Sequence, residues 1–315
     1  MTYKMYIMNF RTAHFGAGAL DSSKTTFAAD RLFSALVIEA KKIGIMDDFI
    51  SLANQDDFIL TDAFPYNFEP FLPKPIGFPK FDQPDLTTDV KEVRRQVKMA
   101  KKLQFIPLDK FDDYVNGTLL EDKEYAVTNI VTKNQSYVDI ALSQVSPDES
   151  TDNYSLYRVS TVRFTDESSL YVIASESEIL NELMTSLQYA GIGGKRSTGY
   201  GLFDLTIADI PNELKNRLTQ SHQGPVMALT TSLPIEEDLE IAMLRGSYLL
   251  SKSSGFAFST QTKENYRKQD IFKFVSGSTF CETYKGQIVD VRPLNFSHAV
   301  LNYAKPLFFN MEAEE

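Results

Sequence analysis

The chain has 315 residues, of which 43% are hydrophobic and 12% aromatic, enough for two domains with proper cores. Its formal net charge of −10 argues against a free nucleic-acid-binding protein, which is usually basic, but not against a local basic groove on an otherwise acidic surface. The single cysteine, Cys281, excludes an internal disulfide, and without an apolar run of about eighteen residues we expect a cytoplasmic protein with no membrane span.

The first elements along the chain are a strand, a loop and a helix. Residues 3–10 alternate in the manner of a strand, and a loop rich in small residues follows over 11–25. Thr25 or Thr26 can then cap a helix that Gly44 ends. The buried stripe predicted for this helix comprises Leu32, Leu36, Ala40 and Ile43.

A polar insertion interrupts the first half of the chain, at about residues 73–154. The strand before it lies within residues 58–68, and proline and glycine mark residues 71–84 as a loop or an edge excursion. Inside the insertion, cations recur at the spacing of one helix face: Lys91, Arg94, Arg95, Lys98, Lys101 and Lys102. This face is either a solvated helix surface or a contact for a polyanion or an acidic partner.

A strand, a second helix and a last strand complete a β-α-β-β-α-β order. Residues 170–174 predict the strand, and Ser175 with Glu178 predicts a capping box at the start of the helix. Gly191 is placed at the helix end, and the alternation of residues 202–207 predicts the last strand. The apolar face of the helix comprises Ile179, Leu180, Leu183, Met184 and Leu187.

The segment at residues 191–201, called the glycine loop below, has five glycines among its eleven residues. This density indicates backbone with positive φ or a close approach by another group. Adjacent cations, hydroxyls and open backbone amides suit a phosphodiester oxygen, and they come from Gly193, Gly194, Lys195, Arg196, Ser197 and Thr198. The spacing fits neither a Walker A motif nor a dinucleotide fingerprint. An ordinary helix-to-strand turn is the alternative.

Two ring side chains are candidates for contact with a nucleobase. Tyr200 stands between two glycines, where its ring can stack on a base or anchor the loop by packing. His14 lies in the first loop, which should approach the glycine loop because the first and fourth strands of a ferredoxin-like sheet are neighbours. It can contact RNA, act as an acid or base in RNA cleavage, or be a plain polar loop residue.

Further candidate contacts precede the first helix or follow the first strands. Ser22, Ser23 and Lys24 lie before the helix, whose N-terminal amides and dipole favour a phosphate, although simple capping is the alternative. Arg31 on the first turn could reach the same anion. Lys74 sits between two prolines, on stiff backbone that can place a cation.

The second half begins near residues 210–211 and is rich in predicted strands. It suggests a degraded ferredoxin-like fold, with strands near 226–232, 247–258, 271–275, 286–291 and 300–309 and a helix near 235–244. We therefore predict an α+β protein with antiparallel sheets and two ferredoxin-like (RRM-like) domains, residues 1–209 and 210–315. In the second, Lys252, Ser253 and Ser254 repeat the pairing of a cation with hydroxyls.

The sequence predicts no metal site and no cofactor. No Cys/His spacing resembles a zinc site. Asp21 has no obvious second acid nearby that would complete a metal site of carboxylates.

Helix, glycine loop and last strand is the order that marks the RAMP superfamily of CRISPR proteins. The chain resembles, nearly end to end, the fourth subunit of the Csm effector of type III-A systems, in FGAGALDSSK (15–24), TFAADRLFSAL (26–36), FLPKPIG (71–77), KSSGFAF (252–258), NYRK (265–268) and VDVRP (289–293). The resemblance implies a non-catalytic subunit that holds the repeat-derived 5′ tag of the guide RNA (crRNA). It also implies that the subunit joins the large signature subunit to the backbone subunit, with the insertion as a thumb.

Two rival interpretations remain open. Other RAMP proteins are guide-processing endoribonucleases that cleave without metal, and here His14 is the one attractive candidate for that chemistry. A generic protein scaffold would make no RNA contact through the glycine loop.

Overall fold

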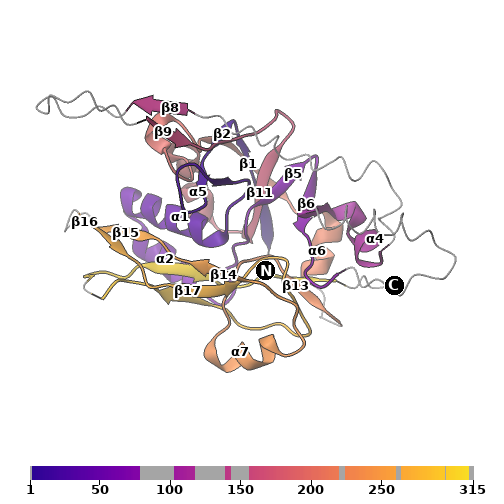
Figure 1. Ribbon diagram of the computed structural model, residues 1–315. Helices are drawn as coiled ribbons and strands as arrows, with labels where there is room; N and C mark the ends of the chain where they lie inside the picture. The colour runs from indigo at the N-terminus through magenta and orange to yellow at the C-terminus, as the bar shows by residue number, and fades with distance from the viewer. Residues whose placement is uncertain are drawn as a thin grey trace, which may run out of the picture.

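The computed structural model describes residues 2–78, 103–117, 139–142, 156–219, 224–259, 264–294 and 296–311. At its centre lies a six-stranded antiparallel sheet in the order β12-β1-β11-β5-β6-β7 (Figure 1). Its strands are β12 (Phe203–Asp209), β1 (Tyr3–Phe10), β11 (Ser169–Ser175), β5 (Phe64–Asn67), β6 (Glu69–Pro73) and β7 (Phe105–Pro107). The first four stand in the order predicted for β-α-β-β-α-β, with the last strand beside the first.

Strand β1 lies between β12 and β11 in this sheet and is buried on both faces. On one face Tyr6 and Met8 pack against helices α1 (Ala29–Ile43), α2 (Met46–Asn54) and α5 (Glu178–Ala190). On the other face Met5 and Ile7 pack into a second core. Because side chains alternate along a strand, β1 contributes residues to two cores, one on each face, instead of packing on one face and facing solvent on the other.

Both cores draw on both halves of the chain. Tyr303 is fully buried among the helices of the first core, and its hydroxyl accepts a hydrogen bond of 2.9 Å from the N–H of Leu60. Met227, Leu307 and Phe309 join the second core beneath the central sheet. The second half thus contributes residues to the cores on both faces of the sheet, and the boundary at residues 209/210 stays a prediction.

The second half is a set of short strands with two helices. Its three-stranded sheet has the order β18-β13-β21, and β14 pairs with β17, β15 with β16 and β19 with β20. The elements are α6 (Asn212–Thr219), β13 (Val226–Ala228), α7 (Glu236–Met243), β14 (Leu250–Ser253), β15 (Phe256–Ser259), β16 (Glu264–Arg267), β17 (Ile271–Phe274), β18 (Thr279–Phe280), β19 (Gln287–Asp290), β20 (Leu301–Ala304) and β21 (Phe308–Asn310). The degraded ferredoxin-like fold predicted for this half stays a prediction.

Both predicted helix caps are wrong, although the predicted ends at Gly44 and Gly191 are confirmed. Helix α1 begins after Ala28 and not at a threonine cap. Helix α5 begins after Ser177, because the hydroxyl of Ser175 is already used: it donates to Asp57 O and accepts from the N–H of Ile59. Tertiary partners outcompete the local capping pattern in both places.

The alternative of an edge excursion holds where β6 lies, and the alternative of a loop does not. Residues 71–73 belong to β6 toward the edge of the sheet, because β5 turns at Phe68, with a φ of 60°, straight into β6. Pro70 and Pro73 are tolerated since they sit toward the edge of the sheet, where fewer backbone donors are needed.

The remaining elements are short. They are β2 (Thr12–Ala13), β3 (Phe15–Gly16), β4 (Ser23–Lys24), the 3-10 turn η1 (Leu108–Lys110), α4 (Phe111–Val115), β8 (Asp139–Leu142), β9 (Leu156–Val159), β10 (Val162–Arg163) and the 3-10 turn η3 (Arg196–Thr198). The predicted cationic helix with Lys91, Arg94, Arg95 and Lys98 lies outside the described residues. Among the helices that the structure describes, none has the length and apolar character needed to cross a membrane.

Candidate nucleic-acid interface

The glycine loop closes on itself between α5 and β12. Gly191 ends the helix with a φ of 76°, and the N–H of Ile192 donates to Gly201 O at 2.9 Å, which ties the two ends together. Between them the turn η3 follows Lys195, which itself has a φ of 57°. The positive φ angles predicted from the glycine density are confirmed.

The glycine loop is fixed to the first loop by backbone contacts. The N–H of Gly194 donates to His14 O and that of Gly201 to Thr12 O, each at 2.9 Å. A Cβ on Gly193 would lie 2.5 Å from His14 O, and one on Gly194 would lie 2.7 Å from His14 Cδ2. Glycine is needed at both positions by this close approach, and the predicted contact between the two loops is confirmed.

His14 lies beneath the glycine loop and is only 4% exposed. Its Nδ1 lies 2.6 Å from Ser160 O, and Gly194 covers the ring. In this arrangement the imidazole supports the two loops. Base stacking or proton transfer by His14 would require the loop to move aside, so its RNA contact stays a prediction.

The polar side chains of the glycine loop face solvent to different extents. Ser197 and Thr198 are exposed, whereas Lys195 and Arg196 are partly exposed. The hydroxyl of Thr198 donates to Lys195 O at 2.7 Å and so stabilises the turn. Arg196 and Ser197 are therefore better placed than Thr198 to meet a phosphate.

A cleft of about 700 Å³ lies between the first half and the β14 region of the second, and we call it the basic cleft. Six of its lining residues are cations, and two are acids, Asp30 and Asp62. The cations are Lys24, Arg31, Lys74, Lys252, Lys268 and Lys273. The cleft thus brings together six of the residues predicted from the sequence, namely Lys24, Arg31, Lys74, Lys252, Ser253 and Ser254.

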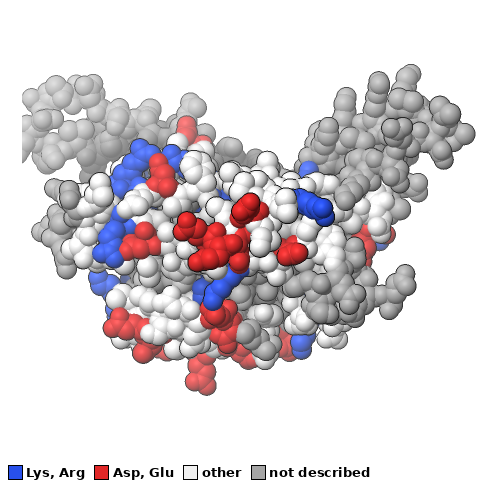
Figure 2. All heavy atoms as spheres, turned by 90° about the horizontal axis from the view of Figure 1, so that it is seen from below, with Lys and Arg blue, Asp and Glu red and all other residues white. Residues whose placement is uncertain are grey.

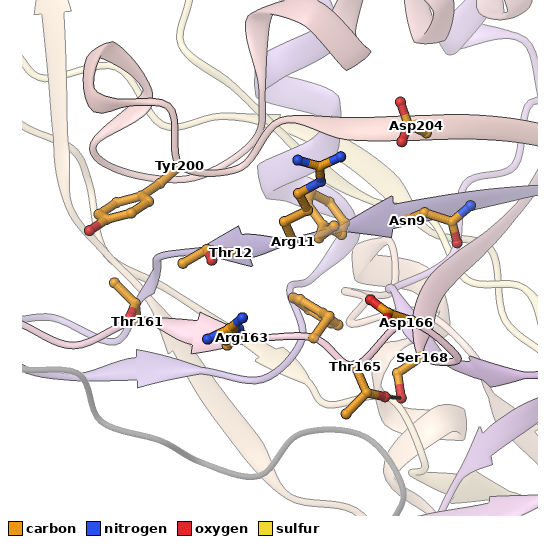
Figure 3. A pocket seen from close by; sticks show the side chains of 12 residues that line it. Asn9, Arg11, Thr12, Thr161, Arg163, Thr165, Asp166, Ser168, Tyr200 and Asp204 are labelled. Carbon is orange, nitrogen blue, oxygen red and sulfur yellow. Dashed lines mark hydrogen bonds between the residues drawn. The ribbon is translucent and has the colours of Figure 1, made fainter.

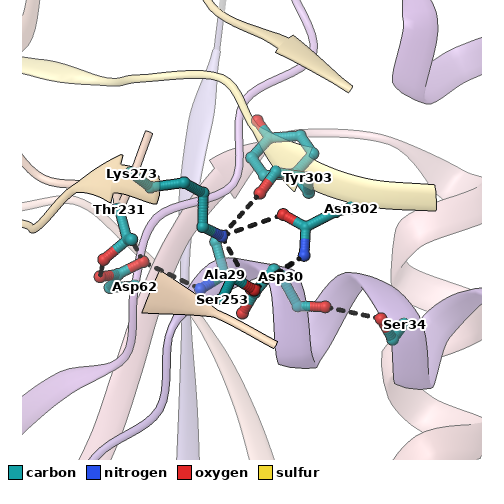
Figure 4. Close-up of polar contacts among 9 residues, drawn as sticks. All are labelled: Ala29, Asp30, Ser34, Asp62, Thr231, Ser253, Lys273, Asn302 and Tyr303. Carbon is teal, nitrogen blue, oxygen red and sulfur yellow. Dashed lines mark hydrogen bonds and ion pairs between the residues drawn. The ribbon is translucent and has the colours of Figure 1, made fainter. Parts of the chain in front are cut away.

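Lys273 forms the floor of the basic cleft with a side chain that is 1% exposed (Figure 4). Its Nζ lies 2.7 Å from Asp30 Oδ2 and 3.0 Å from Asn302 Oδ1. Burial alone would raise the pKa of Asp30, but the Lys273 ammonium and hydrogen bonds from Lys273, Asn302 and Ser253 hold that pKa below its ordinary value. The network joins helix α1 to strands β14, β17 and β20.

Two other cations of the cleft are partly desolvated. Burial lowers the pKa of Lys74 and of Lys268, although the carboxylate of Asp30 partly offsets this for Lys268. An ammonium that has lost water favours a neighbouring anion, since the anion replaces the lost solvation. Lys252 instead forms an ion pair with Asp270 at 2.8 Å.

The residues predicted to place a phosphate at the N-terminus of α1 have other roles. Ser23 and Lys24 form β4, which pairs with β3, and the hydroxyl of Ser23 accepts from the N–H of Phe15 at 2.9 Å. The hydroxyl of Ser22 donates to Ala19 O. These hydroxyls stabilise the hairpin, and the contact with RNA stays a prediction.

The N-terminus of α1 is itself occupied, which corrects the phosphate site predicted there. The carboxylate of Asp62 accepts from the N–H of Ala29 at 2.9 Å and from both the N–H and the hydroxyl of Thr231. Burial raises the pKa of Asp62, and hydrogen bonds from Thr231 and Ala29 oppose the rise. Arg31 donates to Gly16 O at 2.8 Å and so supports the wall of the basic cleft.

Sequence reasoning missed Lys268, Lys273 and Asn302. Lys268 lies in one of the segments that carry the family resemblance, but neither spacing nor composition marks the other two. Their position in the basic cleft depends on strands β17 and β20 reaching α1, a contact across more than half of the chain.

The acidic surface lies elsewhere. Figure 2 shows Asp and Glu side chains gathered near the middle of the face seen from below, with most Lys and Arg nearer its margin. Helix α7 lies at the bottom of Figure 1 and has Glu236, Glu237 and Asp238 in its first turn. Within the described ranges no group of three His, Cys, Asp or Glu residues could hold a metal ion.

Comparison with known proteins decides the family. A family model described as the CRISPR Csm4 C-terminal domain matches residues 221–311. Over 312 residues the chain is 62% identical to the CRISPR system Cms protein Csm4 of Streptococcus thermophilus, a match that covers 99% of this chain and 100% of that one. The chain belongs to the Csm4 family.

More distant relatives agree with this assignment. The Csm4 of Mycobacterium tuberculosis (strain ATCC 25618 / H37Rv) is 33% identical over 312 residues, covering 98% of this chain and 97% of that one. The fold of this Csm4-family chain is similar to a chain in the crystal structure of a Csm3-Csm4 subcomplex from a type III-A CRISPR-Cas interference complex, with a TM-score of 0.62, 19% identity and coverage of 98% and 100%. A chain from a Csm1-Csm4 cassette in complex with pppApA gives a TM-score of 0.56 at 17% identity, with 99% of each chain covered.

Proposed function

We propose that this chain is the non-catalytic, RNA-binding subunit of a type III-A CRISPR effector complex and holds the 5′ tag of the guide RNA. The observation that carries the proposal is the basic cleft. In a protein of net charge −10, six cations from segments far apart in sequence line one concave surface. A phosphate backbone gains most from such a local concentration of charge.

The proposed RNA path crosses the first loop. Gly16, Ala17 and Gly18 of this loop line the basic cleft, and its neighbouring residues Thr12 and His14 hold the glycine loop. In the proposal, phosphates of the tag lie in the basic cleft and pass over the first loop to Arg196 and Ser197. The thumb predicted for the insertion would contribute the cations at Lys91, Arg94, Arg95 and Lys98.

The proposal includes bridging of a large signature subunit and a backbone subunit. Its support is that solved structures contain Csm4 proteins with Csm3 in one case and with Csm1 in another. We also propose two ferredoxin-like domains, residues 1–209 and 210–315, because β12-β1-β11-β5 follows the expected strand order and β18-β13-β21 retains a small antiparallel sheet.

The rival proposal, a guide-processing endoribonuclease using His14, has less support. The imidazole is covered by the glycine loop and occupied by Ser160 O, whereas a general base must reach the 2′-hydroxyl of its substrate. A nuclease would cut repeat RNA as a purified chain, and His14→Ala would abolish the cut.

The test is guide-RNA retention in the co-expressed complex at several salt concentrations. We expect Lys195→Ala/Arg196→Ala, and separately Lys24→Ala/Lys268→Ala, to weaken retention and to make the log–log salt slope shallower by about one to two charges. The matched control is Lys41→Ala/Lys215→Ala, which removes two exposed cations from helices α1 and α6, outside the basic cleft and the glycine loop. Unchanged retention and slope in both test variants would contradict the proposal. An effect of Lys24→Ala/Lys268→Ala alone would indicate that the glycine loop is a structural turn that does not contact the RNA.

A further inference from the structure

Helix α7 presents its large apolar side chains to solvent. Of its eight residues only Ala242 is buried, and it packs with Phe280 in the small core of the second half. Ile241 is 54% exposed, and Leu244, at the C-cap of the helix, is 67% exposed. A surface helix normally turns its apolar side chains toward the core and its charged ones toward water. Contacts within the described part of the chain therefore do not explain the apolar residues of α7.

The segment after α7 continues this apolar surface. Tyr248 packs against Phe274 and Phe280, with ring centroids 4.6 Å and 6.4 Å away, and so joins the core that α7 covers. The next two residues, Leu249 and Leu250, are exposed. The helix and the segment after it are thus anchored on one core while their apolar side chains face solvent. We call these exposed side chains the α7 patch: Leu239, Ile241, Met243, Leu244, Leu249 and Leu250.

The α7 patch does not overlap the basic cleft or the pocket beside the glycine loop. In the β14–β17 pair, Ser251 and Lys273 stand opposite each other and line the basic cleft, and Leu250 faces the other way because side chains alternate along a strand. The pocket has a volume of about 620 Å³ and is lined by residues that include Tyr200 and Arg11, and base stacking by Tyr200 stays a prediction (Figure 3). Within the described part of the chain, no residue of the α7 patch lines either hollow. An occupant of the α7 patch therefore leaves both hollows open.

Acidic side chains edge the α7 patch. Glu236, Glu237 and Asp238 form the first turn of the helix, and Glu240 follows among the apolar residues. Helix α7 lies at the bottom of Figure 1, and Figure 2, the view from below, shows acidic side chains gathered near the middle of that face. Such a surface repels phosphates, and it also disfavours a second copy of this chain, whose net charge is −10. It favours a protein surface with Lys and Arg around an apolar centre.

We propose that the α7 patch is the docking surface for another protein subunit of the effector complex, one that offers an apolar centre with a basic rim. The apolar side chains lose contact with water on docking and so stabilise the contact, while the acidic edge pairs with the basic rim and directs its orientation. This inference rests on the bridging part of the proposed function and deepens it, because it assigns one subunit contact to named residues and gives the chemistry of the surface that they meet.

The test is the subunit composition of the co-expressed complex, purified through a tag on this chain and measured by native mass spectrometry. Ile241→Ser/Leu244→Ser should lower the amount of one neighbouring protein subunit per chain by about tenfold or more, because two apolar contacts are lost. Thermal unfolding of the full chain should stay close to that of the wild type, since both side chains are exposed. The matched control, Ile38→Ser/Leu294→Ser, removes two exposed apolar side chains outside the α7 patch and should leave the composition unchanged.

Charge reversal tests the chemistry of the partner surface. Glu236→Lys/Glu237→Lys should weaken retention of the same subunit at low salt, and the difference from the wild type should shrink as added salt screens the rim. Stronger retention of that subunit, or additional RNA bound by the charge-reversed variant, overturns the inference, because the occupant would then be an acidic surface or a nucleic acid.

Carbodiimide crosslinking of the wild-type complex covers variants that fail to assemble. This reagent joins carboxylates to lysines without a spacer, and it should join Glu236, Glu237 or Glu240 to a lysine of the neighbouring subunit. The absence of such a crosslink, crosslinks to a second copy of this chain alone, or an unchanged composition in Ile241→Ser/Leu244→Ser overturns the inference. The proposed RNA contact is judged separately, by guide retention in the variants of the basic cleft.

Discussion

At the scale of single residues, the buried ion pair of Asp30 and Lys273 makes the sharpest prediction. Lys273→Met leaves the Asp30 carboxylate poorly solvated and unpaired, and we expect the free energy of unfolding to fall by about 3–5 kcal/mol. The native pKa of Asp30 lies below its ordinary value, so the stabilisation that the pair adds is present above that ordinary pKa and is lost as pH falls through the native pKa. Denaturant unfolding of the full chain across acidic pH measures both effects.

The control for this prediction is an ion pair at the surface. Lys285 and Asp56 lie 2.9 Å apart with side chains 57% and 77% exposed, so Lys285→Met should change stability by only about 0–1 kcal/mol. The double variant Asp30→Asn/Lys273→Met should recover part of the loss, since no buried charge remains unpaired. A double variant no more stable than Lys273→Met would contradict the explanation.

At the scale of elements, the glycine loop contains two glycines with similar φ and different surroundings. Gly201 has a φ of 79°, and a Cβ there would lie 2.0 Å from Ile192 O, whereas Gly199 has a φ of 86° and nothing within 4 Å. Gly199→Ala should cost about 1–2 kcal/mol from backbone strain alone, and Gly201→Ala at least about 2 kcal/mol more.

Comparing these two variants cancels the effect of alanine on the unfolded chain. Gly201→Ala should also weaken guide retention, because the N–H of Gly201 fixes the glycine loop to Thr12 O. Thermal unfolding measures both losses of stability. Equal losses in the two variants would mean that the close approach of Gly201 to Ile192 O does not affect stability.

At the scale of the whole molecule, the two halves share their cores. Without residues 210–315 the chain would lose Tyr303 from one core and Leu307 and Phe309 from the other. We expect residues 1–209 expressed alone to bind a hydrophobic dye and to unfold without a cooperative transition. Co-expression with residues 210–315 should restore the cooperative transition. A cooperative transition in the isolated segment, followed by circular dichroism in denaturant, would support two independent domains instead.

The sequence by itself determined the local features of this protein. It predicted the strand order around β1, the ends of α1 and α5 at Gly44 and Gly191, and the contact between the first loop and the glycine loop. The helix ends follow from a glycine at the end of a hydrophobic period, whereas the strand order and the contact between the loops follow from the ferredoxin-like topology that the order of elements predicts. The resemblance of short segments to the Csm subunit predicted the family before any contact was known.

Only the tertiary structure decided which polar groups meet. Asp62 rather than a threonine occupies the N-terminus of α1, Lys273 reaches Asp30 across 243 positions, and Arg11 and Arg163 line one pocket. Such pairings depend on how the two halves of the chain pack together on both faces of one sheet. Periodicity reports which side of an element is buried, but the partner across a core is set by the packing of the whole chain.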